Sequence, residues 1–442
     1  CSIRIEKGVM KILMMSNTYF PVVGGIENSI RFFSEEFRRL GHEVMIAAPS
    51  CEGEANDEKY VIRLPAIKKF YHTEFSVNVP VPGLIPKLIK TFYPDIVHSH
   101  HPFFLGDVAL RLSRQYHIPL VFTYHIMFEK YVHYLPVHNE KAKRFVIELA
   151  AGYSNLAHQV IAPSASVRDL LIKRGVTTPI EVIPTGINLE LFCKGDGNKF
   201  RIRNGIPSDA FVIGHVGRLA QEKNMEFLVR SLVALLKTTP TAHVLMAGHG
   251  PSETMIEDLF RKAGLQARLH LKGFLYNQDL IDAYWAMDVF AFASLSETQG
   301  MVLVEAMAAG VPVVAVDATG VREVVKDYSN GRLVAQPDEH LFVEALQWSL
   351  NCPSRIWQKI KQQAGKTARQ YSIQTCAKRM VDIYQHVQAK ELTHSETESS
   401  WHMLRERMKA EWDIFKNLLE ASEAAVFEKS FKEKQGDKCY RD

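Results

Sequence analysis

The feature that most constrains the fold is the repeated alternation of short apolar runs with amphipathic helical stretches. The first run, Lys11–Met15, leads through Gly24-Gly25 into residues 26–40, where apolar side chains recur every three or four positions. That spacing predicts a helix, and a second run follows at Glu43–Ala48. Strand, glycine turn, helix and strand together form a βαβ unit with parallel strands.

The same alternation continues in two series. Apolar periodicity lapses between the series, and the Gly-, Asp- and Asn-rich stretch Lys194–Asn198 predicts a flexible joint. The further predicted strands are Asp95–Ser99, Leu120–Thr123, Gln159–Ala162, Glu181–Ile183, Phe211–Val216, His243–Ala247, Leu269–Leu271, Val289–Ala293, Val313–Val316 and Arg332–Val334.

These series predict an α/β protein with two doubly wound, Rossmann-like lobes that face each other across a cleft. We expect a first lobe at 10–193, a second lobe at 194–375, a helix at 376–390 that crosses back to the first lobe, and a polar linker with a helical tail at 391–442. Ligands bind beyond the carboxyl ends of such strands, so two lobes suit a reaction between two substrates.

Composition and charge exclude several classes of protein. The 442 residues are 47% hydrophobic and carry a net charge of +4, which is typical of a globular chain and too small to indicate nucleic acid as the main partner. The six cysteines have no zinc-ligand spacing, so we expect reduced thiols in the cytoplasm. We expect no membrane span and no signal peptide, and Met10 is the expected natural start.

Two glutamates flank a predicted helix start in the stretch Ser294–Met307. Glu297 precedes Gly300, and Glu305 lies within the helix expected to follow it. Amides at a helix start bind anions, and a carboxylate nearby can accept hydrogen bonds from the vicinal hydroxyls of a ribose. The alternative is that Glu297 stabilises the helix N-terminus and Glu305 is solvated or paired.

A second motif places two cations in a strand-to-helix loop. In Gly214–Asn224, Arg218 and Lys223 follow a predicted strand and precede a helix. A guanidinium and an ammonium can neutralise a diphosphate leaving group. The alternative is a pair of solvated surface cations.

With these two motifs in order, the chain resembles the retaining family 4 glycosyltransferases of GT-B fold. Further matches are Gly24-Gly25, Tyr124-His125, Ile183–Ile187 and Ala247–Gly250. The resemblance covers roughly residues 10–385, and the tail beyond 390 has no counterpart in it. Where many members carry Gly-Phe-Gly, this chain has Thr298-Gln299-Gly300, which leaves the donor sugar open.

The resemblance implies a role for each matched residue. Arg218 and Lys223 would grip the nucleotide diphosphate, and Glu305 the ribose hydroxyls. Glu297 and the backbone of Gly300, Met301 and Val302 would hold the donor sugar, and His125 would lie near that sugar beside the reacting carbon. The Gly25 backbone would approach the phosphates from the opposite lobe, and Gly273 with Phe274 would line the base pocket.

The sequence indicates neither a metal nor another cofactor. His98-Ser99-His100-His101 has no accompanying ligand spacing, so we expect His100 or His101 to line the cleft at a strand end. No Asp-x-Asp pair stands where a metal–diphosphate bridge would be expected. We therefore expect metal-independent transfer, with the donor nucleotide sugar as a substrate.

The acceptor side is basic and aromatic. Residues 60–145 carry 11 basic and 5 acidic side chains, which suits an anionic membrane surface, although an amphipathic core helix with a solvated basic face explains the pattern too. The stretch Phe122–Tyr134 is similar to that of bacterial diacylglycerol glucosyltransferases, which are peripheral membrane enzymes. The interleaved residues are Arg63, Lys68, Lys69, Lys87, Lys90, Lys141, Lys143 and Arg144 with Phe70, Tyr71, Phe75, Leu84, Ile85, Leu88, Ile89 and Phe92.

The resemblance therefore implies a retaining hexosyltransferase that moves glucose from UDP-glucose to a lipid such as diacylglycerol, on the cytoplasmic face of the plasma membrane. Other acceptors remain open, namely phosphatidylinositol, a lipid-linked oligosaccharide or a soluble molecule, and so does GDP-mannose as donor. Alternatives of other classes are a nucleotide-sugar epimerase, a sugar phosphorylase and a non-catalytic nucleotide-sugar sensor.

The tail contains an apolar stripe at helical spacing. Residues 391–442 carry 9 basic and 12 acidic side chains, the wrong balance for anionic lipid. We expect the stripe to be buried against the protein's own surface or against a second copy in a homodimer. Its residues are Trp401, Leu404, Met408, Trp412, Phe415 and Leu419.

Overall fold

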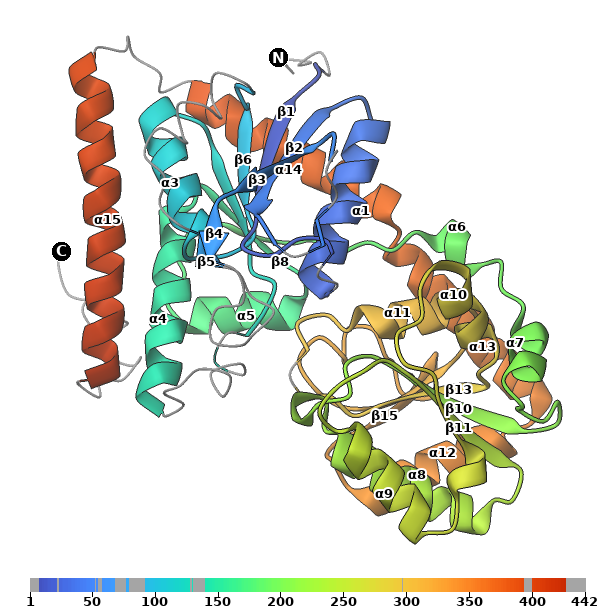
Figure 1. The fold of residues 1–442 in the computed structure, drawn as a ribbon. Coiled ribbons are helices and arrows are strands. Elements are labelled where there is room, and N and C mark those ends of the chain that lie inside the picture. Colours follow the sequence, from blue (N-terminus) through green and yellow to red (C-terminus); the bar gives the residue numbers. More distant parts are fainter. Residues whose placement is uncertain are drawn as a thin grey trace, which may run out of the picture. The chain divides into compact units, whose positions relative to one another are not determined.

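The chain folds into two α/β units, each built on its own parallel sheet (Figure 1). The computed structural model describes residues 8–21, 24–51, 53–54, 58–67, 77–78, 92–127, 129, 140–295, 297–392 and 400–426. The first unit combines Cys1–Gly186 with Cys376–Asp442, and the second is Ile187–Thr375. The predicted architecture of two Rossmann-like lobes with C-terminal helices is confirmed.

The sheet of the first unit has seven parallel strands in the order β3-β2-β1-β6-β7-β8-β9. The chain runs from β1 outward to β3 and then returns to β6 on the other side of β1, so the strand order reverses between β1 and β6. The strands are β1 Lys11–Met15, β2 Glu43–Pro49, β3 Val61–Leu64, β6 Ile96–Ser99, β7 Leu120–Thr123, β8 Gln159–Ala162 and β9 Ile180–Val182, with a separate antiparallel pair of β4 Ala66–Ile67 and β5 Val77–Asn78.

Helices flank this sheet because each has one apolar face. In α1, Ile30, Phe33 and Phe37 are buried, as the spacing predicted. The C-terminal α14 belongs mostly to this unit, and its Tyr384 hydroxyl lies 2.6 Å from Nδ1 of His98 in β6. The helices are α1 Gly25–Arg39, α3 Leu105–Tyr116, α4 Glu140–Leu156, α5 Ala165–Lys173, α14 Ile373–Leu392 and α15 Ser400–Val426.

The second unit repeats this design with six parallel strands in the order β12-β11-β10-β13-β14-β15, which reverses between β10 and β13. The strands are β10 Phe211–Val216, β11 Ala242–Ala247, β12 Leu269–Leu271, β13 Val289–Phe292, β14 Val313–Val316 and β15 Gly331–Val334. The helices are α6 Leu189–Phe192, α7 Gly197–Arg203, α8 Met225–Thr238, α9 Glu253–Lys262, α10 Asn277–Trp285, α11 Met301–Ala308, α12 Glu339–Asn351 and α13 Ser354–Gln370, with 3₁₀ turns η4 Gln221–Lys223 and η5 Gln266–Arg268.

The predicted flexible joint at Lys194–Asn198 is wrong, because this stretch lies inside the second unit and helix α7 begins at its Gly197. The Asp196 side chain caps the helix by accepting a 2.9 Å hydrogen bond from the amide of Lys199. Phe200, one turn on, is buried in the core. The boundary between the units falls after Gly186, because the Ile187 amide donates to the Tyr371 carbonyl within the second unit.

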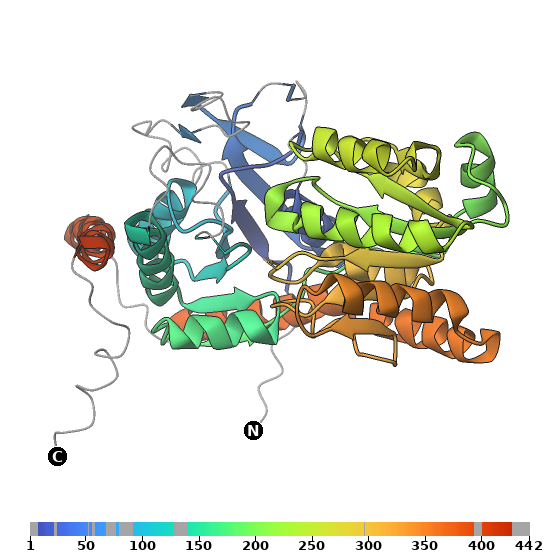
Figure 2. The ribbon, with the colours of Figure 1, turned by 90° about the horizontal axis from the view of Figure 1, so that it is seen from below.

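Helix α15 packs on its own lobe, as predicted, but the face that contacts the lobe is not the predicted apolar stripe. It lies beside α3 and α4 (Figures 1 and 2). Its buried residues are Ala410, Ile414, Asn417 and Ala421, and the small side chains of the two alanines allow close approach to α4. Most of the predicted stripe points outward, with Met408, Trp412, Phe415 and Leu419 all exposed. Among the helices in the described residues, none is long and apolar enough to cross a membrane.

Candidate functional site

The second unit brings a lysine and a glutamate together where its strand order reverses. Lys223 ends the turn η4 in the loop after β10, and Glu297 lies in the loop after the neighbouring β13. The Lys223 ammonium donates a hydrogen bond to Oε1 of Glu297. Only 20% of the lysine side chain and 14% of the glutamate side chain are exposed, so this is a largely buried ion pair. Ligands of doubly wound sheets bind at this position.

The charge of Lys223 keeps Glu297 ionised. Burial by itself would raise the pKa of the Glu297 carboxyl. The positive charge of Lys223 and hydrogen bonds from Lys223 and Ser294 outweigh burial and hold the pKa below its usual value. At neutral pH the site therefore holds a carboxylate that can accept further hydrogen bonds.

A second cation stands in the same loop. Arg218 is about half exposed, and its Nε lies 4.0 Å from Oε1 of Glu222. Gly217, just before it, donates its amide to the Ala247 carbonyl, and a Cβ at Gly248 would lie 1.9 Å from the Gly217 carbonyl oxygen. Because only glycine fits so close to that backbone, Gly248 lets the loops after β10 and β11 meet.

The helix start predicted after Gly300 is present. Gly300 has a φ of +70° and precedes α11, whose first amides belong to Met301 and Val302. In the next turn, Oε2 of Glu305 accepts a 2.7 Å hydrogen bond from the Tyr284 hydroxyl of α10. Burial raises the pKa of Glu305. The Tyr284 hydroxyl thus fixes the Glu305 carboxyl group inside the unit through its Oε2 atom.

Gly273 and Phe274 lie at the same edge of this sheet. The Gly273 carbonyl accepts a 2.6 Å hydrogen bond from the amide of Gly248. Phe274 is exposed on one side and meets the His249 ring edge to face, with 4.9 Å between ring centroids. An aromatic face open to solvent can stack on a planar ligand ring.

The first unit holds the other two predicted residues, Gly25 and His125, at its own point of strand reversal. After β1, the Asn17 amide donates to Nδ1 of His101, which follows β6, at 3.2 Å. At Gly25, where α1 begins, an added Cβ would meet nothing within 4 Å. Among the described residues, no atom blocks the approach of a ligand to the backbone at Gly25, whose role as a phosphate contact stays a prediction.

His125 lies in a group of buried, neutral histidines. Its Nε2 is 2.8 Å from Nδ1 of His100, and the two rings stack. Burial, reinforced by the neighbouring histidines, lowers the pKa of both rings well below 6.5, and burial brings the pKa of His98 and of His101 to about 3. Within the described residues, no group of three or more His, Cys, Asp or Glu side chains is arranged to hold a metal.

Three further residues contact the predicted site without having been predicted. Ser294 bonds Glu297 and Tyr284 bonds Glu305. Glu27 is buried in the first turn of α1, beside the glycine loop, and burial raises its pKa. Only Glu27 had a sequence signal, its place next to Gly24-Gly25, whereas Tyr284 meets Glu305 only through the packing of α10 on α11.

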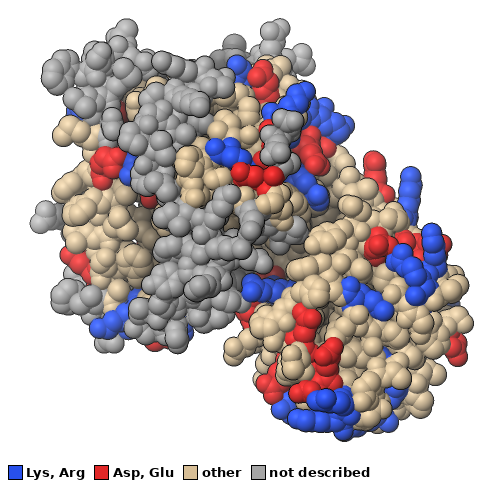
Figure 3. All heavy atoms as spheres, viewed as in Figure 1, with Lys and Arg blue, Asp and Glu red and all other residues tan. Residues whose placement is uncertain are grey.

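The predicted acceptor surface is described only in part. Arg63 is not an open surface cation, because Glu58 accepts hydrogen bonds of 2.6 and 2.7 Å from its guanidinium. Phe92 is buried, and Lys143 pairs with Glu140 at 2.6 Å. On the face shown in Figure 3, described cations are interspersed with acids. Outside the described residues lie Lys68, Lys69, Phe70, Tyr71, Phe75, Leu84, Ile85, Lys87, Leu88, Ile89 and Lys90.

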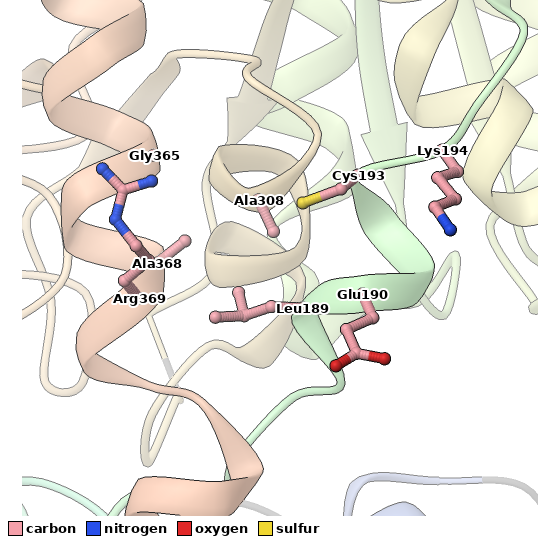
Figure 4. Close-up of a pocket in the computed structure, with 8 residues that line it drawn as sticks. All are labelled: Leu189, Glu190, Cys193, Lys194, Ala308, Gly365, Ala368 and Arg369. Atoms are coloured by element: carbon pink, nitrogen blue, oxygen red, sulfur yellow. The ribbon is translucent and has the colours of Figure 1, made fainter.

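A cavity of about 360 Å³ in the second unit contains none of the predicted site residues (Figure 4). It lies between α6, α11 and α13. Leu189, Ala308 and Ala368 form its apolar wall, while Lys194 points away from the others (Figure 4). The ion pair at the strand ends is therefore a separate feature.

Comparisons with known proteins identify both halves of the chain. The family model "Glycosyltransferase Family 4" matches residues 23–191, and "Glycosyl transferases group 1" matches residues 196–371, so both models end before α14. An alpha-monoglucosyldiacylglycerol synthase of Acholeplasma laidlawii is 29% identical over 318 residues, which are 69% of this chain and 80% of that protein. A GDP-mannose-dependent alpha-mannosyltransferase of Mycobacterium tuberculosis is 27% identical over 346 residues, 76% of this chain and 87% of that protein.

The fold has close structural matches as well. The crystal structure of Anabaena HepE in complex with UDP aligns with a TM-score of 0.68 and 21% identity, and the alignment covers 85% of this chain and all of that one. At this identity the match establishes the two-lobe fold.

Proposed function

Because the chain belongs to the family 4 glycosyltransferases of GT-B fold, and is therefore a hexosyltransferase, we propose that it moves glucose from UDP-glucose to diacylglycerol with retention of anomeric configuration. The observation that carries the proposal is the buried pair of Lys223 and Glu297, with Arg218 in the same loop, at the strand reversal of the second unit. The likeness to a monoglucosyldiacylglycerol synthase supports the choice of donor and acceptor.

The two cations stabilise the leaving group. The Lys223 ammonium, which donates a hydrogen bond to Glu297, places its positive charge at the strand ends, where a phosphate oxygen of the donor can bind. Arg218, about half exposed, can bind the diphosphate through its planar fork. Positive charge fixed where negative charge develops is the main catalytic contribution in such a site.

The carboxylates bind the sugars of the donor. Glu297, ionised because of Lys223, accepts hydrogen bonds from hydroxyls of the transferred hexose. Glu305 keeps one oxygen for the ribose hydroxyls, because Tyr284 occupies only the other. His125, neutral and buried, positions the sugar and is not a charged base.

The reaction is a front-face substitution at the anomeric carbon. The bond between that carbon and the diphosphate oxygen breaks, and the bond to the acceptor oxygen forms on the same face. The acceptor's hydroxyl proton passes to the departing diphosphate. We propose that this step needs no metal, since Arg218 and Lys223 supply the positive charge that a divalent cation would otherwise bring.

A lipid acceptor implies that the protein works at a membrane surface. We propose peripheral binding to anionic lipid through the basic segment at 60–145, whose 11 cations outnumber its 5 acids. Such binding should weaken as ionic strength rises, because exposed charges are screened.

A second candidate is mannosyl transfer from GDP-mannose. It is favoured by the likeness to the mycobacterial mannosyltransferase and by Thr298-Gln299, which replaces the sequence many members carry beside the donor sugar. The acceptor chemistry would stay the same.

The test is a donor screen with the full chain. UDP-glucose, UDP-galactose and GDP-mannose are each offered with diacylglycerol in phosphatidylglycerol vesicles, with and without EDTA, and the glycolipid is identified by mass spectrometry and by its anomeric coupling in NMR. We expect an α-glucoside, formed equally in EDTA. A mannolipid would select the second candidate, a β-anomer would refute retention, and loss of activity in EDTA would refute metal independence.

Variants test the site itself. Lys223→Ala and Glu297→Gln should each lower kcat by at least about 100-fold, whereas the control Lys237→Ala, on an exposed position of α8, should keep wild-type turnover. Wild-type rates in both site variants would remove these residues from the mechanism.

A further inference from the structure

Helix α15 carries a continuous apolar stripe on the side turned away from its lobe. Met408 is 66%, Trp412 63% and Phe415 56% exposed, and Leu419 continues the stripe one turn later. The Trp412 and Phe415 rings touch, with centroids 6.0 Å apart. An apolar patch of this kind on a soluble protein marks an interaction surface.

The helix cannot bury this stripe by turning over, because its opposite face is already fixed. Asn417 donates to the Leu149 carbonyl at 3.1 Å, and Gly152 leaves room for its side chain. Arg111 of α3 holds Glu411 through bonds of 2.6 and 3.0 Å. Both anchors lie on or beside the inner face, so the stripe needs a partner from outside.

The spacing of the stripe fits a short coiled-coil seam of less than two heptads. Met408, Trp412, Phe415 and Leu419 follow one another at intervals of four, three and four residues, which are the d and a positions of a heptad. A strict period of 3.5 residues keeps one seam facing a second helix along its length.

The charges beside the seam fit a second copy in parallel orientation. Glu411 lies on one edge at a g position and Lys416 on the other edge at an e position, the pair that meets across a parallel coiled coil. Within one chain Glu411 is bound by Arg111 and Lys416 lies 3.9 Å from Glu420, and the contact between copies would join these existing pairs into one network. In an antiparallel pair, Lys409 and Lys416, which share one edge, would face each other. The tail has no excess of cations for anionic lipid, with 9 basic against 12 acidic residues.

We propose that α15 is a dimerisation element: two copies of the chain pair these stripes in parallel about a two-fold axis, while the inner face of each helix stays on its own lobe. The interface is isologous, since each copy presents the same seam. Four apolar layers make it a modest interface, so the dimer dissociates on dilution.

The test measures the mass of the full chain by analytical ultracentrifugation over a concentration series. Trp412→Glu should raise the dimer Kd at least about 30-fold, with unchanged circular dichroism and Tm. The matched control is Ile202→Glu, a substitution at an 80% exposed apolar residue of the second unit, which should leave the Kd unchanged.

Cross-linking tests the orientation. In a parallel pair, Phe415→Cys places the same position of both copies side by side, so mild oxidation should give a covalent dimer, whereas Glu420→Cys, off the seam, should not exceed the wild-type background. A wild-type chain that is monomeric at every concentration overturns the proposal. If that monomer binds phosphatidylglycerol vesicles and Trp412→Glu abolishes the binding, the stripe is a membrane anchor instead.

Discussion

Removing one partner of the buried Lys223–Glu297 pair should cost stability as well as activity. Lys223→Met leaves a carboxylate that is only 14% exposed without its cation, and Glu297→Gln replaces the anion beside the ammonium by a neutral acceptor. Breaking a buried pair in this way costs about 3–5 kcal/mol. Because 14–20% of each side chain still reaches water and Ser294 still bonds Glu297, we expect about 2–3 kcal/mol for each single variant.

The double variant Lys223→Met/Glu297→Gln should lose less than the sum of the two single losses, since it buries no uncompensated charge. The expected coupling is about 2 kcal/mol. For a unit of this size each kcal/mol shifts Tm by about 2–4 °C, so each single variant should melt about 5–10 °C lower. Scanning calorimetry of the full chain measures all four proteins. Additive losses, or single variants that melt like the wild type, would show that no buried ion pair exists in solution.

The pH dependence gives a second check on the same pair. In the wild type the lowered pKa of Glu297 adds stability that is present above its unfolded pKa and is lost as pH falls through the folded pKa. Without Lys223, burial dominates and the folded pKa rises above the unfolded value. The Tm deficit of Lys223→Met should therefore be largest at neutral pH and shrink as the pH falls. A deficit that stays constant with pH would contradict this assignment.

Three other predictions concern single sites. Burial keeps the pKa of His125 well below 6.5, so this ring should not titrate between about pH 5.5 and 8. In that range the pH profile of kcat should therefore have the same shape in the wild type and in His125→Asn. Gly300→Ala forces a side chain to a φ of +70° and should cost about 1–2 kcal/mol, visible as a lower Tm, whereas Gly365→Ala in the middle of α13 should be neutral or stabilising. Gly152→Ala would place a Cβ 1.8 Å from Oδ1 of Asn417, so amide exchange across α15 should accelerate, and unchanged exchange would place the anchor elsewhere.

Much of the fold follows from local pattern. The strands Lys11–Met15, Phe211–Val216 and Val313–Val316 coincide with their predictions, because parallel strands buried on both faces are continuous apolar runs in sequence. The stretch Lys194–Asn198 predicts a joint because it is short of apolar residues. Its helix depends on the cap at Asp196 and on one buried contact, Phe200, which no local period reveals.

The sequence predicts which residues belong to the candidate site, but not which of them contact one another. Arg218, Lys223, Glu297 and Glu305 could be selected because their motifs lie at strand ends. That Lys223 and Glu297 pair across 74 positions of sequence follows only from the adjacency of β10 and β13. The contact of Tyr284 with Glu305 likewise depends on how α10 packs against α11.

By itself, the sequence determined the alternation of strands and helices, the glycine loops and the types of charged residue at the strand ends, because each depends on neighbours along the chain. Tertiary structure alone decided which charges neutralise each other and which face of α15 is buried. The apolar stripe of α15 would be expected inside on hydrophobicity alone. Ala410 and Ala421 take the inner position instead, because close approach to α4 needs small side chains, and this leaves Trp412 and Phe415 outside.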